Sequence, residues 1–547
     1  MKGVEAIAQV LQAEGIEFVT CFPLNQILDS AAALKIRPLV SRTERVAVNI
    51  ADGYSRMMCG KKIGVSVVQY GPGAENAFGG IAQAYGDSTP LLCLAGSLER
   101  ARLSIAPNFK VSRNFKHITK WTETVTDVQF IPQMMQRAFA LLRSGKPGPV
   151  LLEFPTDVML SELQGGSFDY TPPKRSRPLG DPMDVREAVD ALISAKAPVL
   201  VAGQGVLYSE AWDELKTLAE LLQIPVASSL NGKSAFPENH SLALGALNGF
   251  SRPRMVDDFL KKADLVFGVG TSFTISKFIT QMPTGKTIAQ VTIDESDISK
   301  DYPTSYGVIG DAKAVLVQMI EHVQHRLGKN GRRGVTQVAT EIQSVKKAFL
   351  KEWMPRLTSN EEPISPYRVI WELMHSVDPM RSVVTHDSGC PRDQLVPFYE
   401  AIVPHGYIGW GKSTPLGSSL GLTMGAKLAK PDWLAIHLMG DAAFGMVGMD
   451  FETAVRNNIP ILTILMNNGV MGGYTKKQPM ASELFGVHRL SGDYKKVAEG
   501  LGGYTERVEK VADLRPSLER AIQQTRLGSP VLLEIITADE PIFPGEK

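Results

Sequence analysis

The sequence has little of three things that would assign it to a specialised class: long apolar runs, excess charge of one sign, and paired cysteines. No stretch approaches about 18 uninterrupted apolar residues, which is the length that a membrane-spanning helix needs. The 58 Lys and Arg residues nearly balance the 57 Asp and Glu residues, and a net charge of +1 gives no general attraction to nucleic acid or anionic membranes. We therefore expect no nucleic-acid partner and no membrane association.

Cysteine usage and the N-terminal segment bear on the compartment. The four cysteines, Cys21, Cys59, Cys93 and Cys390, show neither a C-x-x-C pair nor the spacing of a zinc site. Such usage is typical of free thiols in a reducing environment. Residues 1–15 have the pattern of an amphipathic helix and lack the apolar core and cleavage site of a signal peptide. These features predict a soluble, cytoplasmic protein.

The length of the chain, 547 residues, exceeds what one hydrophobic core serves, so two to four domains are expected. Strand-like and helix-like segments alternate from end to end, which is typical of α/β domains with parallel sheets. We predict an α/β fold of three domains, each a parallel sheet flanked by helices, at residues 1–165, 182–330 and 362–547. Buried strands are predicted at the apolar runs 63–68, 91–95, 150–154, 199–202, 265–269 and 531–536.

Two polar residues follow consecutive buried strands near the C-terminal end. Asp441 follows the apolar run 433–439, and Asn468 follows the run 459–466, with a predicted helix at 449–457 between them. Parallel strands end at one edge of their sheet, so these two oxygen donors should lie together. They suit a Mg²⁺ ion that still takes phosphate oxygens, and a helix starting just after Asp441 would direct backbone N–H groups at those phosphates. The segment therefore predicts a site for a metal-bound diphosphate.

The first and third domains share a short echo. Residues 148–153, Gly-Pro-Val-Leu-Leu-Glu, recur at 528–534 as Gly-Ser-Pro-Val-Leu-Leu-Glu, in each domain as a closing strand. On this echo alone, a duplication is as well supported as a coincidence.

Several segments carry a resemblance to the thiamine-diphosphate-dependent enzymes. Residues 42–56 resemble the glutamate helix of that family, and 440–469 resemble its diphosphate–magnesium motif. Further matches are 70–76, Tyr-Gly-Pro-Gly-Ala-Glu-Asn, and 87–90, Asp-Ser-Thr-Pro. The resemblance covers nearly the whole chain and implies the order pyrimidine-binding, central and diphosphate-binding domain. The chain is most similar to the acetolactate synthase group, which includes pyruvate oxidase, glyoxylate carboligase and oxalyl-CoA decarboxylase.

The resemblance implies a role for each matching residue. Glu44 would bond to a pyrimidine nitrogen of the cofactor and promote its active tautomer, and a carboxyl shielded from water is suited to sharing that proton. Leu416 would bend the cofactor, and the backbone near Thr414 would accept from its pyrimidine. Asp441, Asn468 and the carbonyl of Val470 would bind Mg²⁺. The remaining positions that the resemblance assigns to cofactor binding are Pro23, Gly73, Asn76, Gly389, Cys390, Gly440, Ala442, Ala443 and Met471.

The chain departs from the family around the substrate pocket. Leu24 stands after Pro23 where relatives have glycine, and Leu24 together with Asn25 would narrow the pocket or change its hydrogen bonding. Thr43 stands where the residue before the glutamate is usually histidine. Lys110 takes the place of a glutamine beside the substrate, where it either pairs with a substrate carboxylate or is a surface lysine.

The central domain also departs from its relatives. Gly203-Gln204-Gly205 and Gly268-Val269-Gly270 are strand-end glycines that suit a nucleotide, although the third glycine of the dinucleotide motif is missing. Thr271 to Thr274 stand where flavin-binding relatives have an Arg-Phe-Asp segment. This difference makes FAD doubtful and leaves ADP, CoA or an empty domain as the alternatives.

The resemblance implies a thiamine-diphosphate- and Mg²⁺-dependent lyase or transferase. It would decarboxylate a 2-oxo acid and ligate the acyl carbanion to a second carbonyl, as a carboligase does. The alternatives are an acyl-CoA lyase or decarboxylase of the oxalyl-CoA type, a simple 2-oxo acid decarboxylase, and a non-catalytic subunit. The family also implies a homodimer or homotetramer whose sites are shared between chains. The choice of substrate would lie in the first domain.

Overall fold

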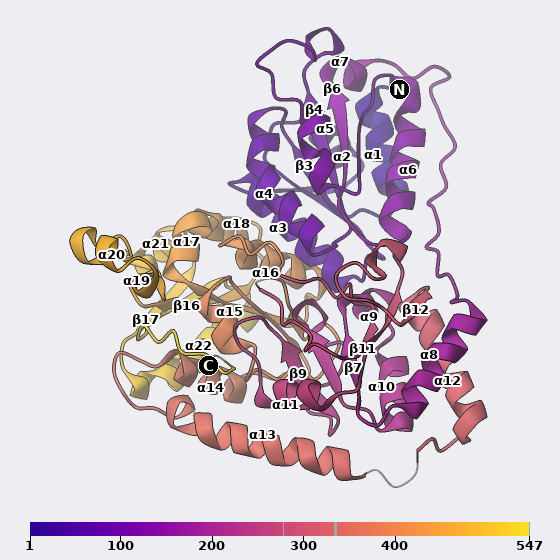
Figure 1. The fold of residues 1–547 in the computed structure, drawn as a ribbon. Helices are drawn as coiled ribbons and strands as arrows, with labels where there is room; N and C mark the ends of the chain where they lie inside the picture. The colour runs from indigo at the N-terminus through magenta and orange to yellow at the C-terminus, as the bar shows by residue number, and fades with distance from the viewer. Residues whose placement is uncertain (277, 333–335, 546–547) are drawn as a thin grey trace.

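Three parallel sheets of six strands each organise the chain, one in each of its successive thirds (Figure 1). The computed structural model describes residues 1–276, 278–332 and 336–545. The predicted α/β class with three parallel sheets is confirmed. The last two positions of the predicted third domain, 546–547, lie outside the described residues.

The first sheet has the strand order β2-β1-β3-β4-β6-β5. Its apolar strands are buried on both faces, which is why they read as continuous hydrophobic runs rather than as alternating patterns. The strands are β1 (Phe18–Cys21), β2 (Arg37–Val40), β3 (Gly64–Val68), β4 (Leu91–Ser97), β5 (Trp121–Thr124) and β6 (Val150–Pro155). The α-helices are α1 (Gly3–Ala13), α2 (Ile27–Ala33), α3 (Glu44–Met57), α4 (Pro72–Gly86), α5 (Val111–Phe115), α6 (Ile131–Arg143) and α7 (Thr156–Leu160).

The middle sheet has the order β9-β8-β7-β10-β11-β12, which is the strand order 3-2-1-4-5-6 of dinucleotide-binding folds. Its strands are β7 (Pro198–Ala202), β8 (Val226–Ser229), β9 (Ala243–Leu247), β10 (Leu265–Val269), β11 (Thr287–Thr292) and β12 (Tyr306–Ile309). Its α-helices are α8 (Pro182–Ser194), α9 (Gln204–Ser209), α10 (Trp212–Leu222), α11 (Arg254–Lys262) and α12 (Ala312–Leu327). The order reverses between β7 and β10, where such sheets form a crevice at their carboxyl edge.

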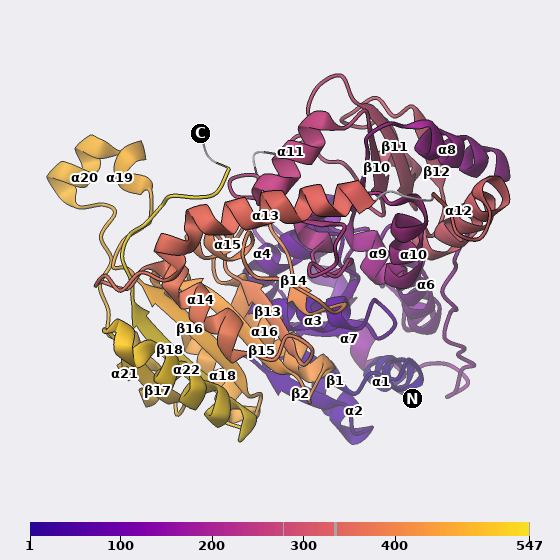
Figure 2. The same cartoon turned by 90° about the horizontal axis from the view of Figure 1, so that it is seen from below.

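The third sheet has the order β14-β13-β15-β16-β18-β17. Its strands are β13 (Ser382–His386), β14 (Tyr407–Ile408), β15 (Leu434–Gly440), β16 (Ile461–Asn467), β17 (Tyr504–Val508) and β18 (Val531–Ile536). Its α-helices are α14 (Pro366–Ser376), α15 (Cys390–Leu395), α16 (Ser418–Ala429), α17 (Asp441–Val447), α18 (Phe451–Arg456), α19 (Tyr474–Lys477), α20 (Pro479–Phe485), α21 (Tyr494–Gly500) and α22 (Val511–Arg526). The long helix α13 (Thr336–Leu357) leads into this domain along the outside of the molecule (Figures 1 and 2).

The helix predicted at 449–457 begins and ends differently in the structure. A 3-10 turn occupies Gly448–Asp450, and α18 covers only Phe451–Arg456. The side chain of Asp450 accepts hydrogen bonds from the backbone of Arg42 and from Thr43 in the first domain, each at 2.8 Å. A contact across 407 residues of sequence therefore sets the start of this helix, and helical periodicity could not reveal it.

The first and third sheets repeat one topology strand for strand, so β6 and β18 occupy equivalent places. Each carries a buried glutamate that joins three neighbours. Glu153 accepts from Ser97 Oγ at 2.6 Å, from the backbone N–H of Ser112 at 3.0 Å and from Thr124 Oγ1 at 2.8 Å. Glu534 accepts from three groups in corresponding places: Asn467 Nδ2 at 2.8 Å, the Lys495 backbone N–H at 3.0 Å and Arg507 Nε at 3.0 Å. The sequence echo thus marks an internal duplication.

The equivalent helices α3 and α16 pack directly on each other (Figure 1). Glycines make this close approach feasible because they have no Cβ atom. A Cβ at Gly425 would lie 2.1 Å from the carbonyl oxygen of Ile50, and one at Gly53 would lie 2.3 Å from that of Leu422. The first and third domains therefore meet backbone against backbone.

We predict that Gly425→Ala destabilises the protein strongly. The added methyl group meets backbone atoms of α3 that can move only with the whole helix, and overpacking of this kind lowers stability by roughly 1–3 kcal/mol or more. Thermal unfolding should show a midpoint several degrees below that of the parent chain.

Gly500→Ala is the matched control, because a Cβ added to this exposed helical glycine would have no atom within 4 Å. Its midpoint should stay level or rise slightly, as alanine favours helix. Equal midpoints for the two variants would contradict the close α3–α16 packing.

Candidate functional site

Glu44 is the first residue of α3, directly after β2 at the carboxyl edge of the first sheet. Its side chain is buried, and Asn76 Nδ2 donates to its Oε2 at 3.2 Å. A Cβ at Gly73 would lie 2.9 Å from Glu44 Oε1, so glycine is required at the start of α4 to leave room for the carboxyl group. Three residues predicted for the pyrimidine half of the site thus lie together.

Thr43 has a structural reason to depart from histidine. It caps α3 by accepting from the Val46 backbone N–H at 3.4 Å, and its hydroxyl donates to Asp450 Oδ2 at 2.8 Å. Burial raises the pKa of Asp450, while the hydrogen bonds from Arg42, Thr43 and Thr453 oppose that shift. The residue next to Glu44 therefore joins the first domain to the third.

Asp441 and Asn468 meet at the carboxyl edge of the third sheet. Asp441 begins α17, its Oδ1 accepts from the Ala442 backbone N–H at 2.9 Å, and its Oδ2 accepts from Gly469 N–H at 3.0 Å. Asn468 Oδ1 accepts from the Val470 backbone N–H at 3.2 Å. Both side chains therefore accept hydrogen bonds from the turn at residues 468–470. This closeness was expected from their positions after the neighbouring strands β15 and β16.

The Asp441 carboxylate, the Asn468 amide and the Val470 carbonyl suit a magnesium ion that also takes ligands from phosphate and water. They are too few for a metal ion bound by protein groups alone. Among the described residues, no group of three or more His, Cys, Asp and Glu side chains could hold a metal ion. One carboxylate with an amide and a carbonyl oxygen leaves most of an octahedron to phosphate and water, which is how Mg²⁺ is commonly bound. Burial raises the pKa of the Asp441 carboxyl, and a bound cation would favour its charged form.

Leu416 lies in the loop before α16, where a buried carboxylate that the sequence did not single out holds the turn. Asp387, directly after β13, accepts from the Gly417 backbone N–H at 2.9 Å. It also accepts from Ser419 Oγ at 2.6 Å and from the Ser419 backbone N–H at 3.1 Å. The carbonyl oxygen of Leu416 accepts from the Arg45 guanidinium, next to Glu44. The structure therefore brings Leu416 toward the Glu44 end of α3.

A buried histidine continues this network across the sheet. His437 Nδ1 lies 2.9 Å from Ser419 Oγ, and its Nε2 lies 2.8 Å from Thr463 Oγ1 on the next strand. Burial lowers the pKa of His437 to about 3, so its imidazole is neutral at pH 7. Asp387, Ser419, His437 and Thr463 thus connect the Leu416 turn to both strands that lead to Asp441 and Asn468. The polar residue His437 inside an apolar run was the one sequence signal of this network.

Gly389 and Cys390 stand at the start of α15, beside the turn that follows β16 at residues 468–472, here called the Asn468 turn. Gly389 has a φ of 86°, which favours glycine, and Cys390 Sγ lies 2.8 Å from where a Cβ of Gly472 would be. Burial raises the pKa of the Cys390 thiol to about 12, so the group is neutral. Met471 is held in the same turn by its backbone N–H, which donates to the His488 carbonyl at 2.7 Å.

The positions that depart from the family around the substrate pocket fall into two kinds. Asn25 is used within its own domain, because its Nδ2 donates to the Val68 carbonyl at 3.0 Å and its Oδ1 accepts from the Ile27 backbone N–H at 3.0 Å. Leu24, beside Pro23, has an exposed fraction of 56%. Lys110 is half-buried just before α5. Leu24 and Lys110 thus remain accessible at the carboxyl edge of the first sheet.

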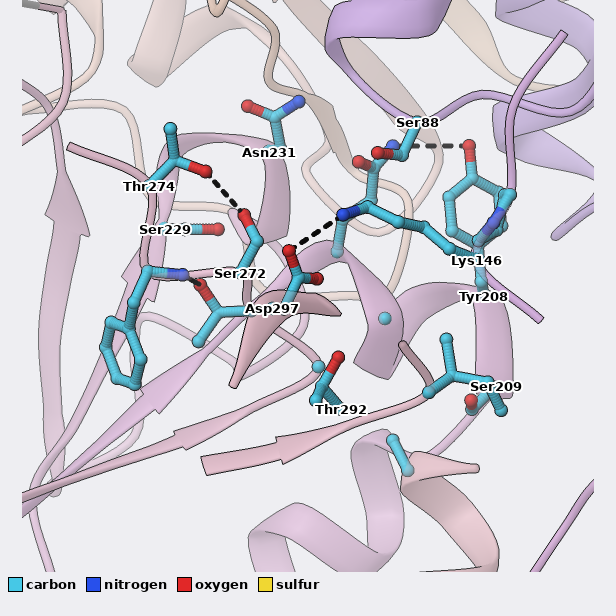
Figure 3. Close-up of a pocket in the computed structure, with 18 of the residues that line it drawn as sticks. Ser88, Lys146, Tyr208, Ser209, Ser229, Asn231, Ser272, Thr274, Thr292 and Asp297 are labelled. Atoms are coloured by element: carbon cyan, nitrogen blue, oxygen red, sulfur yellow. Dashed lines mark hydrogen bonds and ion pairs between the residues drawn. The ribbon is translucent and has the colours of Figure 1, made fainter. Parts of the chain in front are cut away.

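A separate cavity of about 150 Å³ lies at the carboxyl ends of β7 and β10 of the middle domain, and residues of the other two domains, such as Ser88 and Lys412, also line it (Figure 3). Gly205 and Gly270 line it, and a Cβ at the neighbouring Gly203 would lie 2.1 Å from the Gly270 carbonyl oxygen. These glycines are therefore needed for the two strand ends to approach each other. The cavity occupies the crevice where the strand order reverses.

Three protein-family models match the chain in order, and together they cover most of it. The N-terminal TPP binding domain of the thiamine pyrophosphate enzymes matches residues 1–126, the central domain matches 185–319, and the C-terminal TPP binding domain matches 387–535. Each matched range falls on one of the three sheets.

Curated relatives match over nearly their whole length. The chain is 29% identical to a probable acetolactate synthase large subunit of Methanococcus aeolicus, over 100% of the chain and 94% of that protein. It is 29% identical to a glyoxylate carboligase of Escherichia coli O157:H7, over 98% and 93%. It is 27% identical to acetolactate synthase isozyme 3 large subunit of Escherichia coli K12, over 100% and 96%.

Within the described residues, no helix is both long and apolar enough to span a bilayer.

We predict that Asp387→Asn disturbs the Leu416 turn. The amide replaces an acceptor oxygen by an N–H₂ donor that faces N–H or O–H groups, so buried donors lose their partner, at roughly 1–3 kcal/mol each. The thermal midpoint should fall. Fluorescence of Trp410, whose Nε1 donates to the His386 carbonyl next to Asp387 at 2.7 Å, should change. Asp432→Asn, an exposed change in the same domain, is the control, and equal behaviour of both variants would refute the anchoring role.

We also predict an acid sensitivity caused by His437. The pKa of His437 is about 3 in the folded protein and near the usual 6.5 in the unfolded chain. Between these pH values the unfolded chain therefore binds a proton at His437, whereas the folded protein does not. The free energy of unfolding should fall by about 1.4 kcal/mol per pH unit from this group between pH 6.5 and 3. The free energy of unfolding should be measured at pH 7 and at pH 5. Its decrease between these two pH values should be about 2 kcal/mol smaller in His437→Gln than in the parent chain. The exposed His325→Gln serves as control, and an unchanged slope in His437→Gln would refute the assignment.

Proposed function

Because the chain belongs to the thiamine pyrophosphate enzymes, we propose that it decarboxylates a 2-oxo acid and ligates the acyl group to a second carbonyl, in the manner of an acetolactate synthase. The named relatives support this activity, since they align along the whole chain and include both acetolactate synthases and a glyoxylate carboligase. Pyruvate forming 2-acetolactate is the reference reaction.

One observation carries the proposal: the chain retains a buried Glu44 together with the Asp441–Asn468 pair. A scaffold that had lost catalysis would have no need for a carboxyl group kept out of water beside Gly73 and Asn76. Thiamine diphosphate, when bound, supplies the carbanion chemistry of its thiazolium ring.

The protein's own residues would orient the cofactor and exchange a proton with its pyrimidine ring. Glu44 would hold a proton at its carboxyl group for a pyrimidine nitrogen, with Asn76 fixing the direction of the carboxyl by its hydrogen bond. Leu416, positioned by Asp387 through Gly417, would bend the cofactor, and the carbonyls near Thr414 would accept from the pyrimidine. Gly440, Ala442, Ala443 and the turn Asn468–Met471 would contact the diphosphate.

We propose Mg²⁺ as the metal, held by Asp441, Asn468 and the carbonyl of Val470. Substrate selection is assigned to Leu24 and Lys110, where a cationic side chain would pair with the carboxylate of a 2-oxo acid. We also propose a cytoplasmic homodimer or homotetramer with sites shared between chains. Helix α20 supports assembly, because it extends from the body and exposes Met480, Leu484 and Phe485 (Figure 2).

An acyl-CoA lyase or decarboxylase of the oxalyl-CoA type is the second candidate. It is favoured by the exposed basic pair Lys476 and Lys477 on α19, just beyond the Asn468 turn, which could bind the phosphates of CoA. A panel of 2-oxo acids and acyl-CoA esters, with thiamine diphosphate and Mg²⁺, separates the candidates by the mass of the product. A hydroxyketone acid supports the ligase, whereas free aldehyde supports a simple decarboxylase.

We predict that Glu44→Gln lowers turnover by about 10²–10⁴-fold, the range for loss of a positioned acid–base group. Thiamine diphosphate should still bind, as followed by calorimetry, because residues of the third domain would hold its diphosphate end. Glu187→Gln, an exposed change in the middle domain, should keep full turnover. Unchanged turnover of Glu44→Gln with every substrate that the parent enzyme converts would sink the activation role.

A further inference from the structure

Asp87, the first residue of the segment 87–90, lies fully inside the protein at the end of α4. Its Oδ2 accepts a hydrogen bond from Arg56 Nη2 at 3.0 Å and another from Gln83 Nε2. Its Oδ1 accepts from the backbone N–H of Lys412 at 3.3 Å. One buried carboxylate of the first domain therefore contacts α3, α4 and a loop of the third domain.

Arg56, at the end of α3, makes a second contact with that loop. Its Nη1 donates to the Gly409 carbonyl at 3.2 Å, while its Nε and Nη2 donate to the carboxylate of Asp52 at 2.5 and 3.2 Å. Hydrogen bonds to ionised groups are stronger than those between neutral groups, and the low dielectric of a buried site strengthens them further. The pair of Asp87 and Arg56 thus holds the main chain of the loop at two points.

The charges of this cluster favour the contact with the loop. Asp52 and Asp87 face the single guanidinium of Arg56, so one negative charge is left over when all three groups are ionised. Burial raises the pKa of Asp52, Arg56 opposes that shift, and Asp87 adds to it. A carboxylate kept from water needs hydrogen-bond donors, and the Lys412 N–H is a donor that the third domain supplies to Asp87.

The loop in question, residues 409–417, joins β14 to α16 and carries two residues proposed to receive the cofactor. Thr414 has a φ of 56°, a left-handed conformation that a threonine keeps only when its surroundings hold it there, and Leu416 follows two residues later. At the end of the loop, the carbonyl oxygen of Leu416 accepts from the guanidinium of Arg45. Side chains of the first domain therefore hold the loop both before and after Thr414.

We propose that Asp87 is a positioning residue that fixes the start of the loop 409–417 together with Arg56. The loop then keeps Thr414 and Leu416 in the conformation that receives thiamine diphosphate. The attachment of the loop is independent of the proposed function, whereas its effect on the cofactor rests on that function. A detached loop would sample other conformations, and the cofactor would bind only to the fraction of molecules in which the loop is in place.

Hydrogen–deuterium exchange, followed by mass spectrometry on peptides that cover residues 409–417, tests the attachment without cofactor or turnover. Asp87→Asn places an N–H₂ group against N–H donors, so a contact of Asp87 is lost and the loop amides should exchange faster than in the parent chain. Leu218→Ala is the control, because it lowers stability by removing side-chain atoms from the core of the middle domain. A loss of global stability raises exchange in the buried strand β15, whereas a detached loop raises it selectively in 409–417.

Gln83→Met is a milder second variant that acts on the same contact. The Gln83 side chain is buried, its Nε2 donates to Asp87, and its Oε1 finds no partner among the described residues. Methionine has a similar length and removes the donor and the unsatisfied oxygen together, so the fold should survive. Exchange should rise in the same loop peptides as in Asp87→Asn, but by less.

Calorimetric titration of thiamine diphosphate with Mg²⁺ tests the effect on the cofactor. If the loop of Asp87→Asn is in place in about one tenth of the molecules, the dissociation constant rises about tenfold. Saturating cofactor selects the molecules with the loop in place, so turnover should then return close to that of the parent chain. Leu218→Ala and the exposed Asp432→Asn should bind thiamine diphosphate like the parent chain.

Two results would overturn the inference: loop exchange in Asp87→Asn and Gln83→Met equal to that of the parent chain, or the same selective rise in Leu218→Ala. If Asp87→Asn does not fold, Gln83→Met decides by itself. Faster loop exchange with an unchanged dissociation constant would overturn the effect on the cofactor. Failure of the proposed function gives a different pattern: the loop would loosen and the cofactor would bind more weakly in the variants, while the parent chain converts no 2-oxo acid.

Discussion

The close contact between α3 and α16 is the constraint on which the rest of the structure depends. Each helix follows the carboxyl edge of its own sheet, and a residue proposed for the site stands at the N-terminal end of each: Glu44 on α3, and Leu416 just before α16. Glycines 53, 421 and 425 let the two backbones approach until a methyl group would collide. The bond from Arg45 to the Leu416 carbonyl shows that the two N-terminal ends lie together. The relative placement of Glu44 and Leu416 within one chain thus depends on glycines that lie outside the proposed site.

The duplication explains why two unlike halves fit one another. Both sheets have the same strand order, and both use one buried glutamate, Glu153 or Glu534, to fasten the penultimate strand to its neighbours. The shared framework leaves the loops at the carboxyl edges free to differ. The loop after β15 has become an oxygen-donor site around Asp441, while the loop after β3 leads into Gly73 and leaves space for Glu44. One architecture therefore carries both the edge proposed to bind a metal and the edge proposed to share a proton with the cofactor.

The sequence predicted features that are local along the chain and missed those created by distant contacts. The buried strands and the closeness of Asp441 to Asn468 followed from apolar runs and strand order. The network of Asp387, Ser419, His437 and Thr463 joins four separate segments, so no spacing rule could reveal it. The predicted helix at 449–457 was shortened for the same reason, because Asp450 bonds to Thr43 of the first domain. Strong local periodicity predicted the elements, and tertiary hydrogen bonds set their ends.

The departures from the family can now be sorted by their contacts. Thr43 is explained by Asp450 and Asn25 by Val68 and Ile27, so both are satisfied inside the protein. Within the part of the chain that the structure describes, no contact explains Leu24 or Lys110, and both stay accessible at the edge of the first sheet. A residue without a structural role can change with the substrate and leave the fold intact. Differences in substrate between this chain and its relatives should therefore arise at Leu24 and Lys110, whereas changes at Thr43 and Asn25 should act on stability first.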